Sequence, residues 1–386
     1  MKPKILALNT FYLPGYNGGG SIRALVNLVH HLQDTFTFKV VTSAFDLHET
    51  TPYSPEQQAC VVGAEGYEIA YLPRGLAQPV HLWRQMREPW DALYLNSSFS
   101  PWFSILPLVF RRLMRKTAIP AIVAPRGELM AGALNSHPGK LRKKKGFLAL
   151  ARWTGHFAGV VFHATSIEEA EGIRALRLGE AAVVLAPDLP PTLGTDVDLG
   201  SPKIPGGLRI VFISRIDPKK NLQFIIETLA KLSSPIEFDI VGPVADEAYW
   251  SQCQEIIRQL PNHLQVRYLG SVPHHKILEV FRDHDCFFFP THAENNGYVI
   301  LESLLAGCPV LLSDRTPWRG LQERGVGFDL PLEQPEAFLT ALEALIALSP
   351  DDHAGMRRAA QAYGRACLKA SKDVTTTRAL FEGVMC

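Results

Sequence analysis

Short apolar runs alternate with helical patterns along the first half of the chain. The stretch that starts near Ser21 repeats apolar residues at helical spacing, and it follows an apolar run with the length of a buried strand. Strands that alternate with crossover helices favour a parallel sheet covered on both faces. The pattern therefore predicts a Rossmann-like, doubly wound α/β domain over residues 1–190, with strands that read ILALN, FKVVTS, YEIAYL, ALYLN, AIVAP and GVVFHAT.

A stretch rich in Pro and Gly then interrupts the alternation. Residues 186–207, APDLPPTLGTDVDLGSPKIPGG, lack a regular apolar period and predict a linker over 191–207. Strand-like runs and helical patterns resume after it, and beyond Pro331 the pattern is helical only. We predict a second Rossmann-like domain over 208–370, with strands that read LRIVFIS, IEFDIVG, QVRYLG, CFFFP, PVLLS and GVGFDL. Loops at the carboxyl ends of parallel strands gather around ligands, so we expect a ligand cleft between the two domains.

Two glutamates stand out in the stretch THAENNGYVILESLLAG of the second half. The buried-strand pattern CFFFP precedes it, and a helix is expected to begin near Gly297 with its first amides directed at an anion such as phosphate. Glu294 lies before this helix and Glu302 lies inside it. Eight helical residues span about 12 Å, whereas two carboxylates that cooperate on one glycosidic bond lie about 5 to 9.5 Å apart.

The spacing of Glu294 and Glu302 thus disfavours a glycosidase pair. It favours the two ends of one elongated ligand with an anionic middle and hydroxyl pairs at its ends, because a carboxylate can accept two hydrogen bonds from a diol. A nucleoside diphosphate-sugar has this shape. The alternative is one surface glutamate and one glutamate in the N-terminal part of a helix, with no ligand between them.

Cations follow the first strand of the second half. In FISRIDPKKNLQFI, Arg215 lies just past the strand and Lys220 just before a helix, where both side chains can neutralise a diphosphate. Lys219 competes with Lys220 for this role. A glycine-rich turn, GYNGGGS, follows the first strand of the chain, and Gly18, Gly19 and Gly20 allow close approach of the backbone to a ligand before a helix for which Ser21 is a candidate cap.

Taken together, these motifs resemble the retaining, nucleotide-sugar-dependent glycosyltransferases of family 4, which have the GT-B fold. The resemblance rests on Arg215 with Lys220, and on E-x7-E at Glu294 and Glu302 followed by LLAGCPVLLSD. It covers nearly the whole chain. The strings APRGELMAGAL and HATSIEEAEGIRAL are similar to a bacterial subgroup that assembles cell-surface polysaccharide such as lipopolysaccharide, exopolysaccharide or capsule.

The resemblance implies a role for each matching residue. Arg215 and Lys220 would hold the diphosphate, Glu302 the ribose hydroxyls, and Glu294 would face the donor sugar in a catalytic role. The remaining donor contacts that it implies are Asn295, Asn296, Gly297 and Tyr298, with Gly18, Gly19 and Gly20 closing over the phosphates from the N-terminal domain. The acceptor would be a glycan or lipid-linked hydroxyl bound by the N-terminal domain. The final helix, within 371–386, would cross back to that domain.

Three residues depart from the family pattern. Asn296 stands where Phe is usual and Tyr298 where His is frequent, which leaves the selectivity of the sugar pocket open. Arg126 occupies the place of a histidine in a P-H-G string, and an arginine cannot act as a general base at ordinary pH. We expect Arg126 either to contact phosphate or an acidic acceptor, or to have a structural role against Glu128 or a carbonyl.

Charge and composition refine this prediction. The net charge of +1 gives no indication of nucleic-acid binding, but the first 190 residues carry 20 Lys and Arg against 14 Asp and Glu, and the rest carry 19 against 24. The excess lies at Arg111–Lys116 and Lys140–Lys145, beside apolar residues, and such a pattern either contacts an anionic membrane peripherally or is simply a solvated face.

Neither a metal nor another cofactor is expected. The six cysteines lack metal-ligand spacing, and the D-x-D strings at Asp196 and Asp283 lie in the linker and at a helix end, where we predict structural roles. His163 and His292 are candidate cleft residues, for which we favour a structural role. With no signal sequence or apolar run long enough to span a bilayer, we expect a cytoplasmic protein, either free or peripheral on the cytoplasmic face of the inner membrane.

Other classes of function stay open. A GT-B sugar-nucleotide epimerase would share the fold and the diphosphate clamp. A catalytically inactive nucleotide-sugar-binding protein stays open because Asn296 and Arg126 are unusual. An NAD-dependent oxidoreductase would need a dinucleotide fingerprint, which this sequence lacks.

Overall fold

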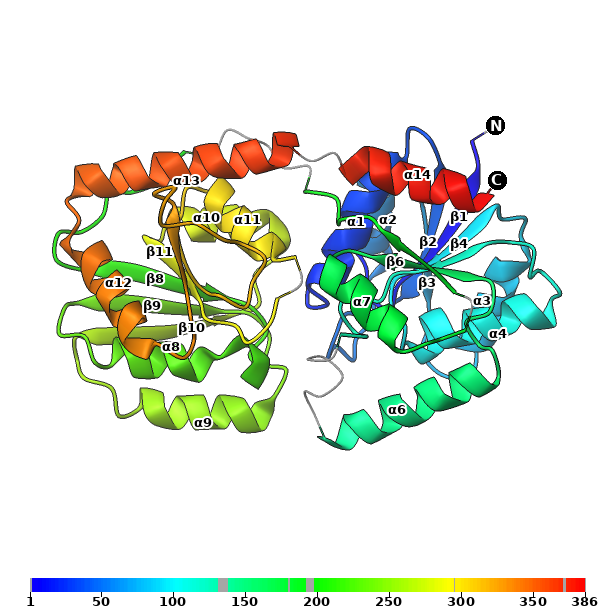
Figure 1. Ribbon diagram of the computed structural model, residues 1–386, viewed down its shortest axis with the longest axis horizontal. Helices are drawn as coiled ribbons and strands as arrows, with labels where there is room; N and C mark the ends of the chain where they lie inside the picture. The colour runs from blue at the N-terminus through cyan, green and yellow to red at the C-terminus, as the bar shows by residue number, and fades with distance from the viewer. Residues whose placement is uncertain are drawn as a thin grey trace. The chain divides into compact units, whose positions relative to one another are not determined.

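The computed structural model describes residues 2–130, 138–179, 181–191, 198–294, 296–370 and 373–385. Contacts divide the chain into two units (Figure 1), one formed by Met1–Thr192 with Ser371–Cys386 and the other by Leu193–Ala370. Each unit holds a parallel sheet with helices packed on it. The predicted α/β class, with two Rossmann-like sheets, is therefore confirmed.

The first unit has a parallel sheet with the strand order β3-β2-β1-β4-β5-β6-β7. Its strands are β1 (Lys4–Leu8), β2 (Thr37–Ser43), β3 (Glu68–Leu72), β4 (Ala92–Leu95), β5 (Ala121–Val123), β6 (Val160–Ala164) and β7 (Ala182–Leu185). Its helices are α1 (Gly20–Leu32), α2 (Pro55–Glu65), α3 (Gln78–Arg87), η1 (Pro101–Ile105), α4 (Leu106–Leu113), α6 (Pro138–Trp153), α7 (Ile167–Ala175) and α14 (Asp373–Met385).

The second unit repeats this plan with the strand order β10-β9-β8-β11-β12-β13. Its strands are β8 (Leu208–Ile213), β9 (Ile236–Val241), β10 (Leu264–Gly270), β11 (Cys286–Phe289), β12 (Val310–Ser313) and β13 (Gly327–Leu330). Its helices are η2 (Pro218–Lys220), α8 (Leu222–Leu229), α9 (Glu247–Ile257), η3 (His274–Lys276), α10 (Ile277–Arg282), α11 (Tyr298–Leu305), α12 (Pro335–Ala347) and α13 (Pro350–Ala370).

The apolar patterns explain these elements. Strands β4, β5 and β11 are apolar and buried at every position because helices cover both faces of each sheet. Helix α8 buries Leu222, Ile225, Ile226 and Leu229, which are spaced by three and four residues and so form one face. Helix α9 begins at Glu247, because the Asp246 carboxylate caps it by accepting a hydrogen bond from the Tyr249 amide.

Two features of the first unit, an edge strand and the packing of the last helix, become visible only in the structure. The edge strand β7 was not predicted, since its four residues are half-buried or exposed and stand directly before the Pro-rich stretch. Helix α14, coloured red in Figure 1, lies beside α1 and β4 although it is remote in sequence. Its Phe381 is fully buried and stacks on Tyr94 of β4 with 5.4 Å between ring centroids, so the end of the chain completes the core of this unit.

Candidate active site

The order of the strands singles out one position in the second sheet. The chain leaves β8 to one side, through β9 and β10, and then returns to β11 on the other side of β8. In doubly wound sheets, ligands bind at the carboxyl ends of the two strands that flank such a reversal. Arg215 and Lys220 follow β8, and Glu294 and Glu302 follow β11, so the residues predicted from the sequence gather at this reversal.

Lys220 and Glu294 form an ion pair. The Lys220 ammonium lies 2.6 Å from Oε2 of Glu294 and 5.0 Å from the centre of the Phe289 ring. The lysine side chain is 10% exposed and the glutamate side chain 20%. The pair therefore keeps both charged groups at the edge of the core while each retains access to a ligand.

The backbone between these two groups is tied together. The Lys219 carbonyl accepts hydrogen bonds from the His292 amide at 2.8 Å and from the Thr291 hydroxyl at 3.1 Å. Asn221 takes the left-handed conformation at φ 61° and donates its side-chain amide to the Pro290 carbonyl. The loops after β8 and β11 therefore form one connected structure.

These contacts separate the roles of the neighbouring cations. Lys219 lies against the loop mainly through its carbonyl, and burial, assisted by the adjacent Lys220, lowers the pKa of its ammonium group. Lys220 is the lysine whose ammonium reaches Glu294. Arg215 is exposed just past β8, and within the described part of the chain its side chain has no hydrogen bond or ion pair.

The loop that carries Glu294 is anchored on its far side by the segment after β12. The Glu294 amide donates to the Arg315 carbonyl at 3.0 Å, and the indole of Trp318 donates to the Asn296 carbonyl at 3.0 Å. Asn295 lies outside the described residues. Tyr298 is half-buried at the first position of α11.

Gly297 is required where α11 begins. Its φ is 76°, and a Cβ there would lie 2.8 Å from Cδ1 of Ile300 and 3.1 Å from Nε1 of Trp318. The amides of the first helical turn have no acceptor within the helix, which gives this end a partial positive charge. The predicted start of the helix at Gly297 is thus correct.

Glu302 lies on α11 and is almost completely buried. Its Oε1 atom lies 2.7 Å from Nε2 of His274, which belongs to the short helix η3 after β10. Sequence reasoning missed His274, because nothing in the string VPHHK distinguishes this histidine from its neighbours. Only the fold brings it beside Glu302.

The glycine-rich turn of the first unit follows β1, at the reversal between β1 and β4. Gly19 has a φ of 62° at the N-cap position, and α1 begins at Gly20. The expectation that Ser21 caps this helix is wrong, since Ser21 lies inside the first turn and its hydroxyl donates to the Gly18 carbonyl. A Cβ on Gly18 would lie 2.9 Å from Cδ1 of Ile22 and 3.0 Å from Cβ of Phe11, so a side chain there would require these neighbours to shift.

Arg126 is held by a network in the first unit. Its guanidinium pairs with Asp188 and donates to Asn96 Oδ1 and to the Tyr94 hydroxyl, each at 2.7 Å. Its acidic partner is Asp188, whereas Glu128 accepts hydrogen bonds from Ser97 and Ser98. These contacts give Arg126 a structural role, and any contact with an acceptor or phosphate stays a prediction.

His163 and Asp285, which belongs to the second D-x-D string, have structural partners. His163 is fully buried between the Tyr94 hydroxyl and the Ala186 carbonyl, and burial together with Arg126 lowers its pKa to about 3. His292 is exposed. The Asp285 carboxylate binds the amide and guanidinium of Arg209. Asp196 lies outside the described residues, and among those described no group of three or more His, Cys, Asp or Glu could hold a metal ion.

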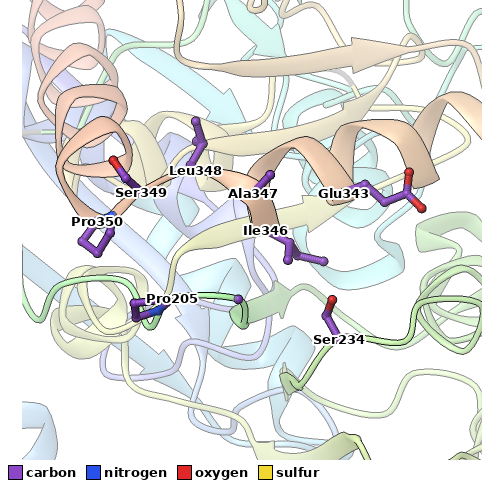
Figure 2. Close-up of a pocket in the computed structure, with 9 residues that line it drawn as sticks. Pro205, Ser234, Glu343, Ile346, Ala347, Leu348, Ser349 and Pro350 are labelled. Atoms are coloured by element: carbon purple, nitrogen blue, oxygen red, sulfur yellow. The ribbon is translucent and has the colours of Figure 1, made fainter.

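Two cavities formed by described residues of the second unit lie elsewhere. One of about 540 Å³ (Figure 2) is lined by Pro205, Ser234, Glu343 and the turn between α12 and α13. Pro205 and Ser234 precede β8 and β9, so this cavity lies at the amino ends of the strands, opposite Arg215 and Lys220. A second, of about 260 Å³, is lined by residues that include Arg209, whose charge is already paired with Asp285. We favour the carboxyl ends because Arg215, Lys220, Glu294 and Glu302 all follow the two strands that flank the reversal, where doubly wound sheets bind ligands.

Two doubly wound units of this kind define the GT-B class of fold, and solved glycosyltransferase structures share it. Anabaena HepE, determined with UDP and glucose, matches over 99% of both chains with 18% identity and a TM-score of 0.67. WaaG, a glycosyltransferase involved in lipopolysaccharide biosynthesis, matches over 98% of this chain and 99% of its own with 14% identity and a TM-score of 0.59.

Residues 200–365 match the family model described as Glycosyl transferases group 1. This part of the chain, which holds most of the second unit and the Lys220–Glu294 pair, is therefore a glycosyltransferase domain of that family. A phosphatidyl-myo-inositol mannosyltransferase of Mycobacterium leprae (strain TN) is 27% identical over 179 residues, which is 44% of this chain. The match spans about 45% of that relative.

Proposed function

We propose that the protein is a retaining glycosyltransferase that moves a sugar from a nucleoside diphosphate-sugar to a hydroxyl of a glycan or lipid-linked acceptor, in the assembly of cell-surface polysaccharide. The observation that carries this proposal is the grouping of Lys220, Glu294 and Glu302 around the start of α11. The family match over residues 200–365 supports the reaction class. The structure of HepE with UDP and glucose and the lipopolysaccharide role of WaaG support the donor and the pathway.

The donor would lie along this group. The Lys220 ammonium, Arg215 and the first amides of α11 supply positive charge for the diphosphate. Glu302 accepts hydrogen bonds from the ribose hydroxyls, and Glu294 faces the sugar. These charges make a metal ion unnecessary for departure of the diphosphate.

The reaction follows from this placement. The acceptor oxygen forms a bond to the anomeric carbon on the face from which the diphosphate departs, and the bond from that carbon to the phosphate oxygen breaks. The acceptor hydroxyl gives its proton to the departing oxygen. Lys220 and Arg215 stabilise the charge that develops on this oxygen, so configuration is retained without a covalent intermediate on the enzyme.

Helix α6 would bring the enzyme to its acceptor. In the first basic segment, Arg111 donates to the Ile119 and Thr117 carbonyls, so part of that charge stabilises the fold. On α6, by contrast, Leu150 is 54% and Trp153 85% exposed, and the exposed cations of this helix are Arg142, Lys143, Lys145 and Arg152. Exposed apolar and basic side chains on one helix suit the anionic surface of a membrane. The proposal includes peripheral contact with the cytoplasmic face. No described helix is both long and apolar enough to cross a bilayer.

The test is a panel of nucleotide-sugars, assayed for binding and slow hydrolysis, with and without EDTA. Purified wild-type protein should hydrolyse at least one donor slowly, and Glu302→Ala should weaken binding of that donor by at least tenfold. Glu279→Ala is the control, since Glu279 lies on α10, outside the proposed site. Undiminished turnover by Glu302→Ala would contradict the site, and isomerisation of the donor without acceptor would identify an epimerase.

A further inference from the structure

The contact between His274 and Glu302 joins two parts of the second unit that are remote in sequence. Nε2 of His274 lies 2.7 Å from Oε1 of Glu302, and the two side chains are 21% and 7% exposed. His274 begins the short helix η3, and Glu302 lies in the middle of α11. A polar contact this short at the edge of the core fixes the position of both groups.

The chemistry of the contact assigns the proton. An ionised carboxylate only accepts hydrogen bonds, so Nε2 of His274 carries a hydrogen and donates it to Oε1 of Glu302. The imidazole ring then holds the carboxylate plane in one orientation. Within the described part of the chain, His274 provides the one hydrogen bond to the Glu302 carboxylate, which leaves acceptor capacity on Oε2.

A carboxylate oriented in this way suits a pair of vicinal hydroxyls, each of which donates one hydrogen bond. Helix α11 holds the backbone of Glu302, because its carbonyl accepts from the Ala306 amide at 3.0 Å. The side chain would still rotate about its own bonds if His274 did not hold it. The histidine therefore determines whether the acceptor atoms stand where a ribose can reach both.

We propose that His274 is a positioning residue that orients Glu302 to accept hydrogen bonds from the ribose hydroxyls of the donor, and that it thereby sets a preference for ribonucleotides over deoxyribonucleotides. This inference rests on the proposed function, and it names a residue that acts through Glu302 rather than on the reacting atoms.

The experiment measures binding of UDP and GDP and of their 2′-deoxy counterparts to the full chain by calorimetry. Wild-type protein should bind one ribonucleotide about tenfold more tightly than its deoxy form, since a hydrogen bond to a charged group is lost. In His274→Phe the ratio of the ribonucleotide affinity to the deoxyribonucleotide affinity should fall to within about twofold of unity. The affinity for the deoxy form itself should change little. His274→Gln, which keeps a donor, should retain most of the ratio.

The neighbouring residue supplies the control. His275 is exposed on the same short helix, so His275→Phe adds the same ring to η3 without touching Glu302, and its ratio should equal that of wild type. Equal losses of ribo and deoxy affinity in His274→Phe would show a purely structural role and overturn the proposal, as would an unchanged ratio. If His274→Phe does not fold, the ratio in His274→Gln and His274→Ala decides. Failure of the wild-type protein to bind any nucleotide would instead contradict the proposed function itself.

Discussion

Replacement of Lys220 by alanine should lower both stability and transfer, and a second substitution should separate the two effects. Loss of the ammonium leaves the Glu294 carboxylate without the charge 2.6 Å from it. Breaking a buried pair costs about 3–5 kcal/mol and breaking an exposed pair about 0–1 kcal/mol. With side chains 10% and 20% exposed, this pair lies between those limits, at about 2 kcal/mol. For a unit of this size the loss lowers the melting temperature by about 4–8 °C.

Transfer should fall for a separate reason. Lys220 would make a charge-assisted hydrogen bond to the diphosphate, and its loss should reduce kcat/KM by about 10- to 100-fold. In the double variant Lys220→Ala/Glu294→Gln, no unpaired charge remains, so most of the stability should return. The transfer rate should stay low, because neither substitution restores a cation.

The assay combines thermal unfolding with steady-state transfer of the donor found in the panel. Lys231→Ala is the matched control, since Lys231 pairs with Glu336 at 3.5 Å on the surface and both side chains are more than half exposed. It should change stability by less than about 0.5 kcal/mol and leave transfer intact. If the single and double variants melt at the same temperature, the ion-pair argument is wrong. If Lys220→Ala transfers sugar at nearly the wild-type rate, the diphosphate assignment is wrong.

Two further predictions concern the first unit. Burial, with Arg126 nearby, lowers the pKa of His163 to about 3, below the value near 6.5 of an unfolded chain. The folded state therefore binds this proton less readily than the unfolded chain, and its stability declines as pH falls below about 6.5. In urea unfolding at pH 7, 5.5 and 4.5, the free energy of unfolding of His163→Gln should decline less steeply with falling pH than that of wild type. An equally steep decline in both proteins would refute this prediction. On α6, Trp153→Ser should weaken cosedimentation with vesicles that contain phosphatidylglycerol by several-fold, whereas Tyr268→Ser, at another partly exposed aromatic residue, should not.

The sequence was sufficient to predict the two parallel sheets and the start of α11, because those features follow from local patterns. Apolar runs identified β8 and β11, and a glycine with a left-handed φ marks the helix start at Gly297. Strand β7 could not be predicted, because a half-exposed edge strand lacks the apolar pattern of a central strand.

The sequence did not predict which residues the predicted site residues pair with. The charged residues Lys220 and Glu294 were each predicted as ligand contacts, but their pairing across 74 positions depends on β8 and β11 lying side by side. Arg126 was considered against Glu128, whereas its carboxylate partner Asp188 comes from beyond the next two strands. Such contacts are set by the order of the strands in the sheet, and no local spacing encodes them.

The pairing of Lys220 with Glu294 has a kinetic consequence. A phosphate that reaches Lys220 must compete with a carboxylate 2.6 Å away that is attached to the same protein and is therefore present at a high effective concentration. Simple inorganic anions should consequently bind weakly, whereas a donor that also contacts Glu302 gains enough from its other groups to displace the carboxylate. If the proposed function is right, the return of Glu294 to the ammonium after transfer would favour departure of the nucleotide product. The same glutamate would then link selectivity for the whole donor to the rate of product release.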